Sequence, residues 1–374
     1  MTSLPDAPRV VVAGGGTAGH IEPAMNLADA LRRLSPDAEV TALGTSKGLD
    51  TTLIPARGYP LELIPPVPLP RSLNRAFLAT PGKVRQAVAA AGEILDRVGA
   101  EVVVGFGGYV AVPAYLAARS RSLPIVVHEA NAKPGLANRG AARLTTHVFT
   151  ASQANLPHAT VIGIPLRPAI SQLDRAALRS EARERFGLDP DRPTLLVFGG
   201  SQGARSINWA ASEAASGLRS AGVQVLHVIG QKNELDLPDG DAPYIVVPYV
   251  EQMQYAYAAA DFALCRCGAM TCAELSAVGL PAAYVPYPVG NGEQRFNAMP
   301  IVAAGGAVLV DDSDLTAQWI LDNVVPRITD PTTVAQMSAA AASAGSRDAD
   351  IVLARHVLTV VTEHRRFPTK RGRS

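Results

Sequence analysis

The sequence predicts an α/β protein with two Rossmann-like, doubly wound domains, and three observations support this prediction. Short β-branched runs alternate with Ala- and Leu-rich amphipathic stretches, as expected of parallel sheets covered by helices. The alternation stops in a polar, proline-punctuated stretch at 167–193 and then restarts with a strand that runs into glycines, as at the N-terminus. The 374 residues exceed one ordinary core and suffice for two such domains. The two domains would face a central cleft at the carboxyl ends of their strands, where ligands bind.

The first domain is predicted to span residues 1–166 and the second to span 167–347. In the first domain a helix at 20–34 follows the first strand, and strands are expected at 9–13, 39–43, 101–104, 125–128 and 147–151. In the second domain strands are expected at 194–198, 223–229, 244–247, 261–264, 282–285 and 307–310. Residues 365–374 form a basic tail that is expected to be flexible.

Composition limits what the protein can bind. Its formal net charge is +1, from 34 basic and 33 acidic residues, which argues against a nucleic-acid partner because such binders need a basic excess. Residues 1–8 lack the features of a signal peptide, and no stretch offers the ~20 apolar residues of a spanning helix. The chain is therefore predicted to be cytoplasmic, or peripheral on the cytoplasmic face of the cell membrane.

The three cysteines lie in one short segment, at Cys265, Cys267 and Cys272, without a nearby histidine or a fourth cysteine. A structural zinc site normally needs four such ligands, so no metal site is predicted. Small buried residues around a strand-to-helix turn are the favoured interpretation.

Three glycine clusters follow predicted strands, at 14–20, 105–109 and 199–204. Glycines allow a positive φ and let an anion approach backbone N–H groups, and the start of the next helix adds partial positive charge. Three such loops indicate two phosphate-bearing ligands or one long ligand. The first cluster also matches a dinucleotide fingerprint through Gly14, Gly16 and Gly19, but no acidic residue ends the second strand. A dehydrogenase is therefore the less favoured alternative.

The segment 265–274 combines a strand end, small residues and a helix start. Gly268 and Ala269 would leave the first helical amides open to a diphosphate, and Glu274 could accept hydrogen bonds from ribose hydroxyls. The alternative for Glu274 is an acid that only favours the helix dipole. Farther on, Glu293 and Gln294 precede a helix predicted at 296–304, and their side chains suit the hydroxyls of a sugar.

Seven short motifs follow one another in a specific order and spacing. They are Gly-Gly-Thr-Ala-Gly-His at 15–20, Gly107-Gly108-Tyr109, His128-Glu129-x-Asn131, Gly163-x-Pro165-x-Arg167, Gly-Gly-Ser-Gln-Gly-Ala at 199–204, Arg266-x-Gly268-Ala269-x-Thr271-x-x-Glu274 and Gln294-x-x-Asn297-Ala298. Together they resemble the MurG family, the N-acetylglucosaminyltransferases of peptidoglycan synthesis, nearly end to end. The resemblance implies a GT-B glycosyltransferase fold, and its last helix, at about 348–364, would pack back on the first domain.

The resemblance also implies the reaction and the roles of residues. GlcNAc would pass from UDP-GlcNAc to the C4 hydroxyl of undecaprenyl-diphospho-MurNAc-pentapeptide, with inversion and without a metal or other cofactor. The donor would be bound by Thr17, Ala18, Gly19, Asn131, Arg167, Ser201, Val250, Ala269, Met270, Thr271, Cys272, Ala273, Glu274 and Gln294. Of these, Glu274 would bind the ribose and Val250 the uracil through its backbone. The acceptor diphosphate would lie against Gly15, Gly16, Gly107, Gly108 and Tyr109.

Such a transfer needs a base for the acceptor proton and positive charge or a dipole to stabilise departing UDP. His20 is the first choice of base and Glu129 the second, while a helix-capping role is the alternative for His20. Two positions depart from the family pattern, since Glu293 stands where a glutamine is common and Ile164 where an asparagine is common.

A lipid-linked acceptor requires contact with a bilayer surface. The stretch 69–78, with Lys83 and Arg85 after it, mixes apolar residues with positive charge, which suits an anionic membrane. The alternative is an amphipathic segment that packs on its own domain. Other proteins of cell-wall synthesis are candidate partners. A UDP-GlcNAc 2-epimerase and a non-catalytic nucleotide-sugar-binding protein are the alternatives to a transferase.

Overall fold

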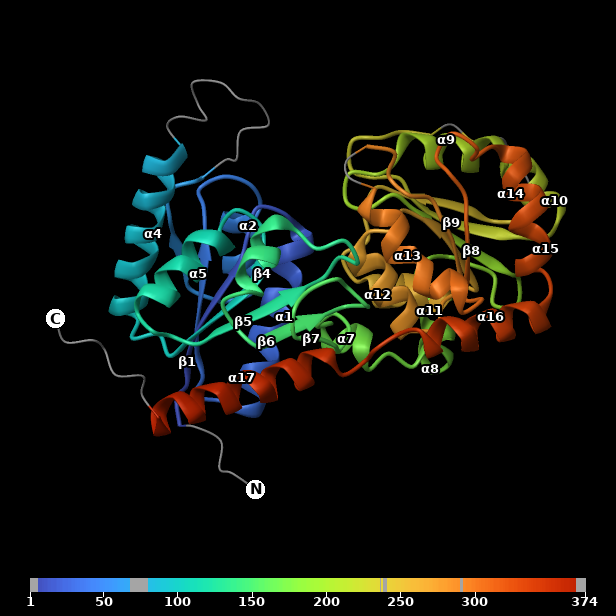
Figure 1. Cartoon of the computed structure of the whole chain (residues 1–374). Coiled ribbons are helices and arrows are strands. Elements are labelled where there is room, and N and C mark those ends of the chain that lie inside the picture. The colour runs from blue at the N-terminus through green and yellow to red at the C-terminus, as the bar shows by residue number, and fades with distance from the viewer. Residues whose placement is uncertain (1–5, 68–79, 236, 238–240, 290–291, 368–374) are drawn as a thin grey trace. The chain divides into compact units, whose positions relative to one another are not determined.

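The computed structural model describes the chain apart from residues 1–5, 68–79, 236, 238–240, 290–291 and 368–374. The chain divides into two compact units. Unit 1 holds the residues up to Arg167 and those from Asp348 onward, and unit 2 is Pro168–Arg347. In each unit, helices cover a parallel sheet (Figure 1), so the predicted α/β class with two doubly wound domains is confirmed.

Unit 1 contains a parallel sheet with the strand order β3-β2-β1-β4-β5-β6-β7 among its described residues. Its strands are β1 (Arg9–Gly14), β2 (Glu39–Gly44), β3 (Leu61–Leu63), β4 (Val102–Gly107), β5 (Ile125–Glu129), β6 (His147–Thr150) and β7 (Ala159–Val161). Its helices are α1 (Ala18–Leu34), α2 (Asp50–Ala56), α4 (Thr80–Arg97), α5 (Ala111–Ser120), α6 (Leu136–Ala141) and α17 (Ala349–Arg366). The strand order reverses between β1 and β4, and such a switch point is where a ligand is expected, at the carboxyl strand ends.

Unit 2 repeats this plan with the order β10-β9-β8-β11-β12-β13 among its described strands. These strands are β8 (Thr194–Phe198), β9 (Gln224–Val228), β10 (Tyr244–Val247), β11 (Phe262–Cys265), β12 (Ala282–Tyr284) and β13 (Ala307–Leu309). The helices are α7 (Pro168–Ser171), α8 (Arg175–Arg185), α9 (Arg205–Glu213), α10 (Ala215–Ser220), α11 (Met253–Ala259), α12 (Ala269–Ala277), α13 (Glu293–Ala303), α14 (Ala317–Asn323), α15 (Val325–Ile328) and α16 (Pro331–Ser343). Its switch point lies between β8 and β11.

The first strand of unit 1 shows why the sequence forms a sheet that is covered on both faces. Val10 and Val12 belong to the core shared with α1 and α17, whereas Val11 and Ala13 belong to the core shared with α4 and α5. Neighbouring side chains of a strand point to opposite faces, so a strand buried on both faces reads as a continuous apolar run.

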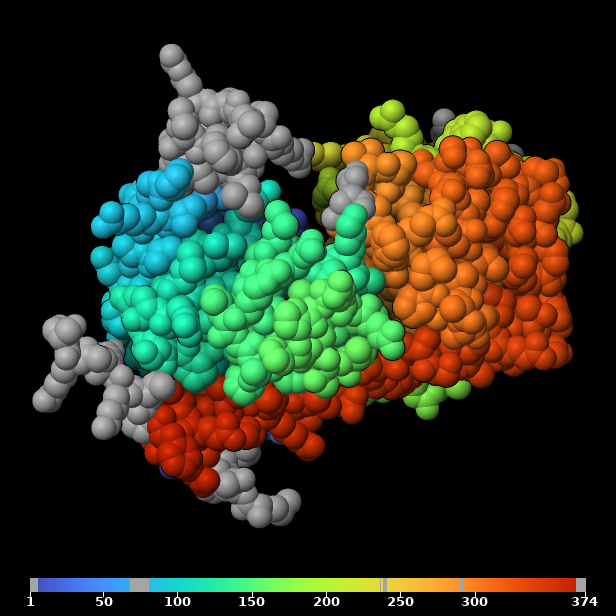
Figure 2. Space-filling model, in the orientation of Figure 1, coloured from blue at the N-terminus to red at the C-terminus, as the bar shows by residue number. Residues whose placement is uncertain are grey.

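The last helix, α17, completes the core of unit 1. Leu353, Val357 and Leu358 are fully buried in the core that α17 shares with α1, and α17 is drawn in red along unit 1 in Figures 1 and 2. Its C-terminal end is held by Arg365, which donates to both carboxylate oxygens of Glu101 at 2.6 and 2.8 Å. The prediction of a flexible tail from residue 365 was therefore wrong for Arg365 and Arg366, because an ion pair extends the helix to Arg366.

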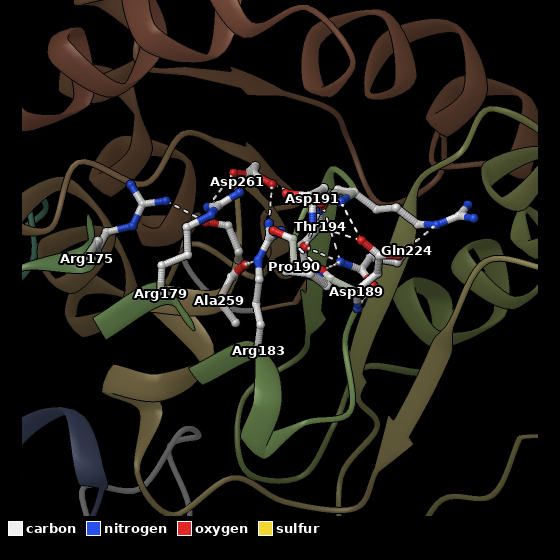
Figure 3. Close-up of polar contacts among 12 residues, drawn as sticks. Arg175, Arg179, Arg183, Asp189, Pro190, Asp191, Thr194, Gln224, Ala259 and Asp261 are labelled. Carbon is white, nitrogen blue, oxygen red and sulfur yellow. Dashed lines mark hydrogen bonds and ion pairs between the residues drawn. The ribbon is translucent and has the colours of Figure 1, made fainter. Parts of the chain in front are cut away.

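Helix α8 is attached to the sheet of unit 2 by three arginines spaced four residues apart (Figure 3). Arg175, Arg179 and Arg183 therefore share one helix face. Arg183 is fully buried, and its guanidinium donates to the carbonyl of Ala259 at 3.1 Å and to Asp261 at 2.9 Å. Burial lowers the pKa of Arg183, and Asp261 compensates in part. These contacts lie at the amino ends of β8 and β11, so we assign them to stability.

The stretch 69–78, predicted to face a membrane, lies outside the described residues. Lys83 and Arg85, which follow it, are exposed on α4. Among the helices of the described chain, none combines the length and the apolar composition needed to cross a bilayer.

Candidate functional site

The two strand ends at the switch point of unit 1 are joined by close backbone contacts. Gly108 has a φ of +78°, and a Cβ at this position would lie 2.6 Å from the carbonyl oxygen of Gly15. A Cβ at Gly15 would lie 2.8 Å from Val110 and 2.9 Å from the carboxylate of Asp50. Only glycine fits such positions without displacing its neighbours. The structure therefore brings together the glycines that the sequence analysis predicted for the acceptor, while Tyr109 is 52% exposed beside them.

His20 lies against the same glycines. A Cβ at Gly107 would be 3.3 Å from Nε2 of His20, and a Cβ at Gly108 would be 3.3 Å from Nδ1. The hydroxyl of Thr17 lies 3.2 Å from Nδ1. The N-cap residue of α1 is Thr17, so His20 contacts the capping residue rather than occupying that position. The ring is half-buried, and Nε2 is the nitrogen on the side away from Thr17.

Asp50, for which no role was predicted from the sequence, binds the backbone of the first glycine loop through its side chain. Its fully buried carboxylate accepts hydrogen bonds from the backbone N–H of Gly16 at 2.6 Å and of Thr45 at 2.8 Å. The Gly16 amide, predicted to face the acceptor diphosphate, is therefore engaged inside the protein. Asp50 starts α2 rather than ending β2. A search for an acidic residue at the strand end consequently misses it.

Glu129, the second choice of base, is enclosed by hydrogen-bond donors. Its side chain is 2% exposed and accepts from the backbone N–H of Asn131 at 2.9 Å, from that of Gly135 at 3.0 Å and from Nδ2 of Asn138 at 3.0 Å. Asn138 is held in turn by the hydroxyl of Tyr115 at 2.8 Å. A carboxylate with both oxygens engaged by internal donors orders its own loop. This geometry favours a positioning role for Glu129 over proton abstraction.

His128 connects β5 to the segment that leads toward Arg167. Its Nε2 lies 2.8 Å from the carbonyl of Gly163, and the side chain is fully buried. Burial lowers the pKa of His128 to about 4, and the Gly163 carbonyl opposes this only in part. The ring is therefore neutral near pH 7, and Nε2 carries the proton that it donates to Gly163. His128 stabilises the loop and is not placed to act on a substrate.

A cavity of about 260 Å³ opens beside the first glycine loop, wholly within unit 1. Its walls are residues 15–16, Thr45, 47–48, 66–67 and 109–110. It therefore adjoins two of the predicted acceptor glycines and Tyr109. The walls at Thr45, 47–48 and 66–67 could not be predicted from the sequence, because they follow β2 and β3, which carry no glycine-rich motif.

In unit 2 the loop at 199–204 is held by glycine contacts with the end of β9. A Cβ at Gly203 would lie 1.9 Å from the carbonyl oxygen of Ile229, and one at Gly230 would lie 2.5 Å from that of Gln202. Both glycines have a positive φ. The segment after β9 thereby fixes the loop, and Ser201 within the loop is exposed.

Helix α12 begins at Ala269, directly after β11, as the sequence predicts. Its N-cap residue is Gly268, and no side chain caps the helix, so backbone amides form its N-terminal surface. Met270, Thr271 and Ala273 are partly exposed, whereas Cys272 is buried. Burial raises the pKa of the Cys272 thiol well above its usual range, so this side chain is neutral.

Glu274 lies one turn into α12 and is 8% exposed. The hydroxyl of Tyr257 donates to its Oε2 at 2.6 Å. This hydrogen bond fixes the orientation of the carboxylate. The orientation is what a ribose-binding carboxylate needs, since a bound diol requires an acceptor in a defined position.

The loop after β12 is fixed by Arg266, whose guanidinium donates to the carbonyls of Val285 at 3.3 Å and Pro286 at 3.2 Å and forms an ion pair with Asp312. Next in this loop, the backbone N–H of Tyr287 donates to Oε1 of Gln294 at 3.0 Å. The backbone of Tyr287 therefore orients the side chain of Gln294 through its oxygen Oε1. The amide nitrogen Nε2 does not take part in this hydrogen bond.

The remaining predicted donor residues lie in both units. Val250 is 8% exposed in the segment after β10, in unit 2. Thr17, Ala18, Gly19, Asn131 and Arg167 belong to unit 1, with Arg167 as the last residue before unit 2 begins. Within the described part of the chain, no group of His, Cys, Asp and Glu side chains is arranged to hold a metal ion.

Two parallel-sheet units, each with a glycine-lined switch point, have the architecture of the GT-B fold. Residues 10–150 match the glycosyltransferase family 28 N-terminal domain, and residues 194–352 match the corresponding C-terminal domain. The chain belongs to glycosyltransferase family 28.

Relatives that match nearly the whole chain carry a specific name. A Thermobifida fusca protein is 57% identical over 96% of both chains, and a Saccharopolyspora erythraea protein is 59% identical over 95% of this chain and 94% of its own. Both are named UDP-N-acetylglucosamine–N-acetylmuramyl-(pentapeptide) pyrophosphoryl-undecaprenol N-acetylglucosamine transferase. Among solved structures, Acinetobacter baumannii MurG matches with a TM-score of 0.76 and 26% identity, covering 96% of this chain and 99% of that chain. The predicted family resemblance is confirmed.

A UDP-GlcNAc 2-epimerase from Neisseria meningitidis has a similar fold, with a TM-score of 0.66 over 94% of this chain and 100% of that chain. Its 14% identity shows the shared fold alone. The fold alone therefore does not distinguish an epimerase from a transferase. The relatives that match nearly the whole chain are named as transferases.

Proposed function

We propose that this protein transfers GlcNAc from UDP-GlcNAc to the C4 hydroxyl of undecaprenyl-diphospho-MurNAc-pentapeptide, with inversion at the anomeric carbon. The observation that carries the proposal is the 57% identity, over 96% of the chain, to a relative named for this transfer. The acceptor's lipid would hold the enzyme at the cytoplasmic face of the membrane as a peripheral protein.

Unit 2 would bind the donor. The uncapped start of α12 at Ala269 and the exposed Ser201 offer N–H and O–H donors for the diphosphate. Glu274, held by Tyr257, would accept from the ribose hydroxyls. The helix dipole would also stabilise the negative charge that develops on departing UDP. Gln294, oriented by the backbone of Tyr287, would present its amide nitrogen to a hydroxyl of GlcNAc.

Unit 1 would bind the acceptor and supply the base. The C4 oxygen of MurNAc attacks the anomeric carbon of GlcNAc, its proton passes to Nε2 of His20, and the bond from the anomeric carbon to the β-phosphate oxygen breaks. Nε2 is the suitable atom because Nδ1 already contacts the hydroxyl of Thr17. That contact also fixes the ring, which a general base requires. Asn131 and Arg167 would help to place the sugar and its leaving group.

An assay with UDP-GlcNAc and a lipid-diphospho-MurNAc-pentapeptide acceptor tests the proposal. We expect UDP release by the wild type only in the presence of acceptor, and no change on addition of EDTA. His20→Ala should lower kcat by about 100-fold or more, because proton transfer by a positioned base typically contributes this much. Glu274→Ala should mainly raise the KM for UDP-GlcNAc. His364→Ala, which removes a histidine near the end of α17, serves as the control and should retain activity.

The outcomes separate the alternatives. No acceptor-dependent UDP release by the wild type would overturn the proposal. Turnover of UDP-GlcNAc without acceptor would instead indicate an epimerase. Binding of UDP-GlcNAc without turnover under either condition would indicate a nucleotide-sugar-binding protein.

A further inference from the structure

The cavity in unit 1 is too small for a whole acceptor but adjoins the place where the acceptor diphosphate is expected. Sites for drug-sized ligands typically measure 300–1,000 Å³, whereas this cavity measures about 260 Å³. It can therefore hold one fragment of a larger ligand. Gly15, Gly16 and Tyr109 in its wall place it next to the predicted diphosphate site.

The first glycine loop offers fewer backbone N–H groups to an anion than its sequence suggests. The Gly16 amide donates to Asp50 at 2.6 Å, and the Thr45 amide donates to the same carboxylate at 2.8 Å. Two N–H groups of the wall are thus directed to an internal anion. A diphosphate that binds here needs positive charge from another source, because an unpaired phosphate and a buried carboxylate would repel each other.

Lys47 supplies that charge. It lines the cavity and is exposed, and within the described chain no carboxylate pairs with its ammonium group. Its segment is held by Gly48, where a Cβ would lie 2.8 Å from the carbonyl oxygen of Gly16. The backbone of Lys47 is therefore fixed against the glycine loop, and the flexible side chain remains available to a phosphate.

Part of the cavity lining is apolar. Val67 and Val110, which are 6% and 2% exposed, line the cavity together with Pro66 and Tyr109. An ammonium group beside an apolar wall suits an amphiphile with a phosphate at one end and a hydrocarbon chain attached to it. The nucleotide, the sugars and the peptide are too polar for this wall.

We propose that this cavity binds the lipid end of the acceptor, with Lys47 paired to the diphosphate and with Val67 and Tyr109 in contact with the first isoprene units. The inference rests on the proposed function and adds a subsite to it. Lys47 and Val67 would make the enzyme prefer prenyl diphosphates over diphosphates without a hydrocarbon chain.

Two soluble acceptors test this subsite. Both carry diphospho-MurNAc-pentapeptide, one with a farnesyl group and one with a methyl group in place of the lipid. Lys47→Ala should raise the KM for both acceptors about tenfold or more, since a charge-assisted contact is lost. The KM for UDP-GlcNAc should stay within about twofold, and Lys47→Arg should restore most of the affinity. Val67→Ser should raise the KM for the farnesyl acceptor about fivefold and leave that for the methyl acceptor unchanged.

Arg119→Ala is the matched control, because it removes an exposed positive charge from the far end of α5 in the same unit. It should behave as the wild type does. Acceptor KM values within twofold of wild type for Lys47→Ala would overturn the subsite, as would an equal effect of Val67→Ser on both acceptors. If the wild type transfers GlcNAc to neither acceptor, the proposed function fails instead. Calorimetric binding of farnesyl diphosphate, lost in Lys47→Ala, would then still support the subsite, and equal binding by both proteins would overturn it.

Discussion

At the scale of single residues, two buried carboxylates control the loops of unit 1, and Asp50 is the clearer case. It accepts from the amides of Gly16 and Thr45 and has no exposed surface. Asp50→Asn should lower the free energy of unfolding by about 1–3 kcal/mol, because an amide nitrogen would face one of these N–H donors. Urea denaturation measures this loss. Asp37→Asn, at an exposed turn, should change stability by less than about 0.5 kcal/mol, and equal effects of both substitutions would contradict the role of Asp50.

Glu129 is the second carboxylate, and its pH dependence distinguishes a positioning residue from a base. Glu129→Gln should lower kcat, because one of its donors, such as Asn138, loses its acceptor. The acidic limb of the pH profile for kcat/KM should remain, since we assign that limb to His20. His20→Gln should remove the limb. If Glu129→Gln also removes it, Glu129 is the base and the assignment of His20 is wrong.

The sequence located the glycine loops but could not show which of their amides remain available. Gly15 and Gly108 are recognisable because only glycine permits their close approaches, and Gly16 and Gly107 because their φ is positive, so a pattern of glycines is left in the chain. Asp50 leaves no such pattern, because its partners are backbone groups and its distance from Gly16 depends on how β2 pairs with β1. The enclosure of Glu129 likewise depends on Asn138, which belongs to a separate helix. The roles of the other predicted site residues stay predictions.

At the scale of secondary structure elements, the central strands of both sheets and the edge strands of unit 2 were predictable, whereas the edge strands of unit 1 were not. Each strand predicted from the sequence overlaps an observed one, because strands covered on both faces are continuously apolar. β3 and β7 have three residues each and lie at the edges of the sheet of unit 1. Their residues are largely exposed or half-buried, so hydrophobicity does not mark them.

Helix α17 follows the unit 2 segment in sequence but belongs to the core of unit 1, and one pair of valines tests this. Val357 is fully buried and Val352 is 37% exposed on the same helix. Val357→Ala should lower the free energy of unfolding by about 2 kcal/mol through the lost contacts and the residual cavity. Val352→Ala should change it by less than about 0.5 kcal/mol. Chemical denaturation monitored by circular dichroism measures both, and similar losses would show that α17 does not pack as described.

At the scale of the whole molecule, each unit contains at least one buried histidine that makes its stability depend on pH. Burial lowers the pKa of His227 in unit 2 to about 3 and that of His128 in unit 1 to about 4. Burial also lowers the pKa of His147 and of His356 in unit 1, where Nδ1 of His147 lies 3.0 Å from Nε2 of His356. His128 and His227 therefore stay neutral in the folded state at pH values where the unfolded chain takes up protons, below about pH 6.5. Both units should therefore lose stability as the pH falls through 6.5, by up to about 1.4 kcal/mol per pH unit for each fully buried histidine.

The positions of the tryptophans allow unit 2 to be observed separately. The chain has 2 tryptophans, Trp209 and Trp319, and both belong to unit 2. Tryptophan fluorescence should therefore follow the unfolding of unit 2, whereas circular dichroism follows both units. Between pH 7.5 and 5.0 the fluorescence-monitored urea midpoint of the wild type should fall, because protonation of the unfolded chain at residue 227 is not matched in the folded state. His227→Gln should remove most of this fall, and His128→Asn should leave it unchanged while reducing the pH dependence seen by circular dichroism. If His128→Asn alters the fluorescence transition as strongly as His227→Gln, the two units do not unfold independently, and their stabilities cannot be assigned to separate histidines.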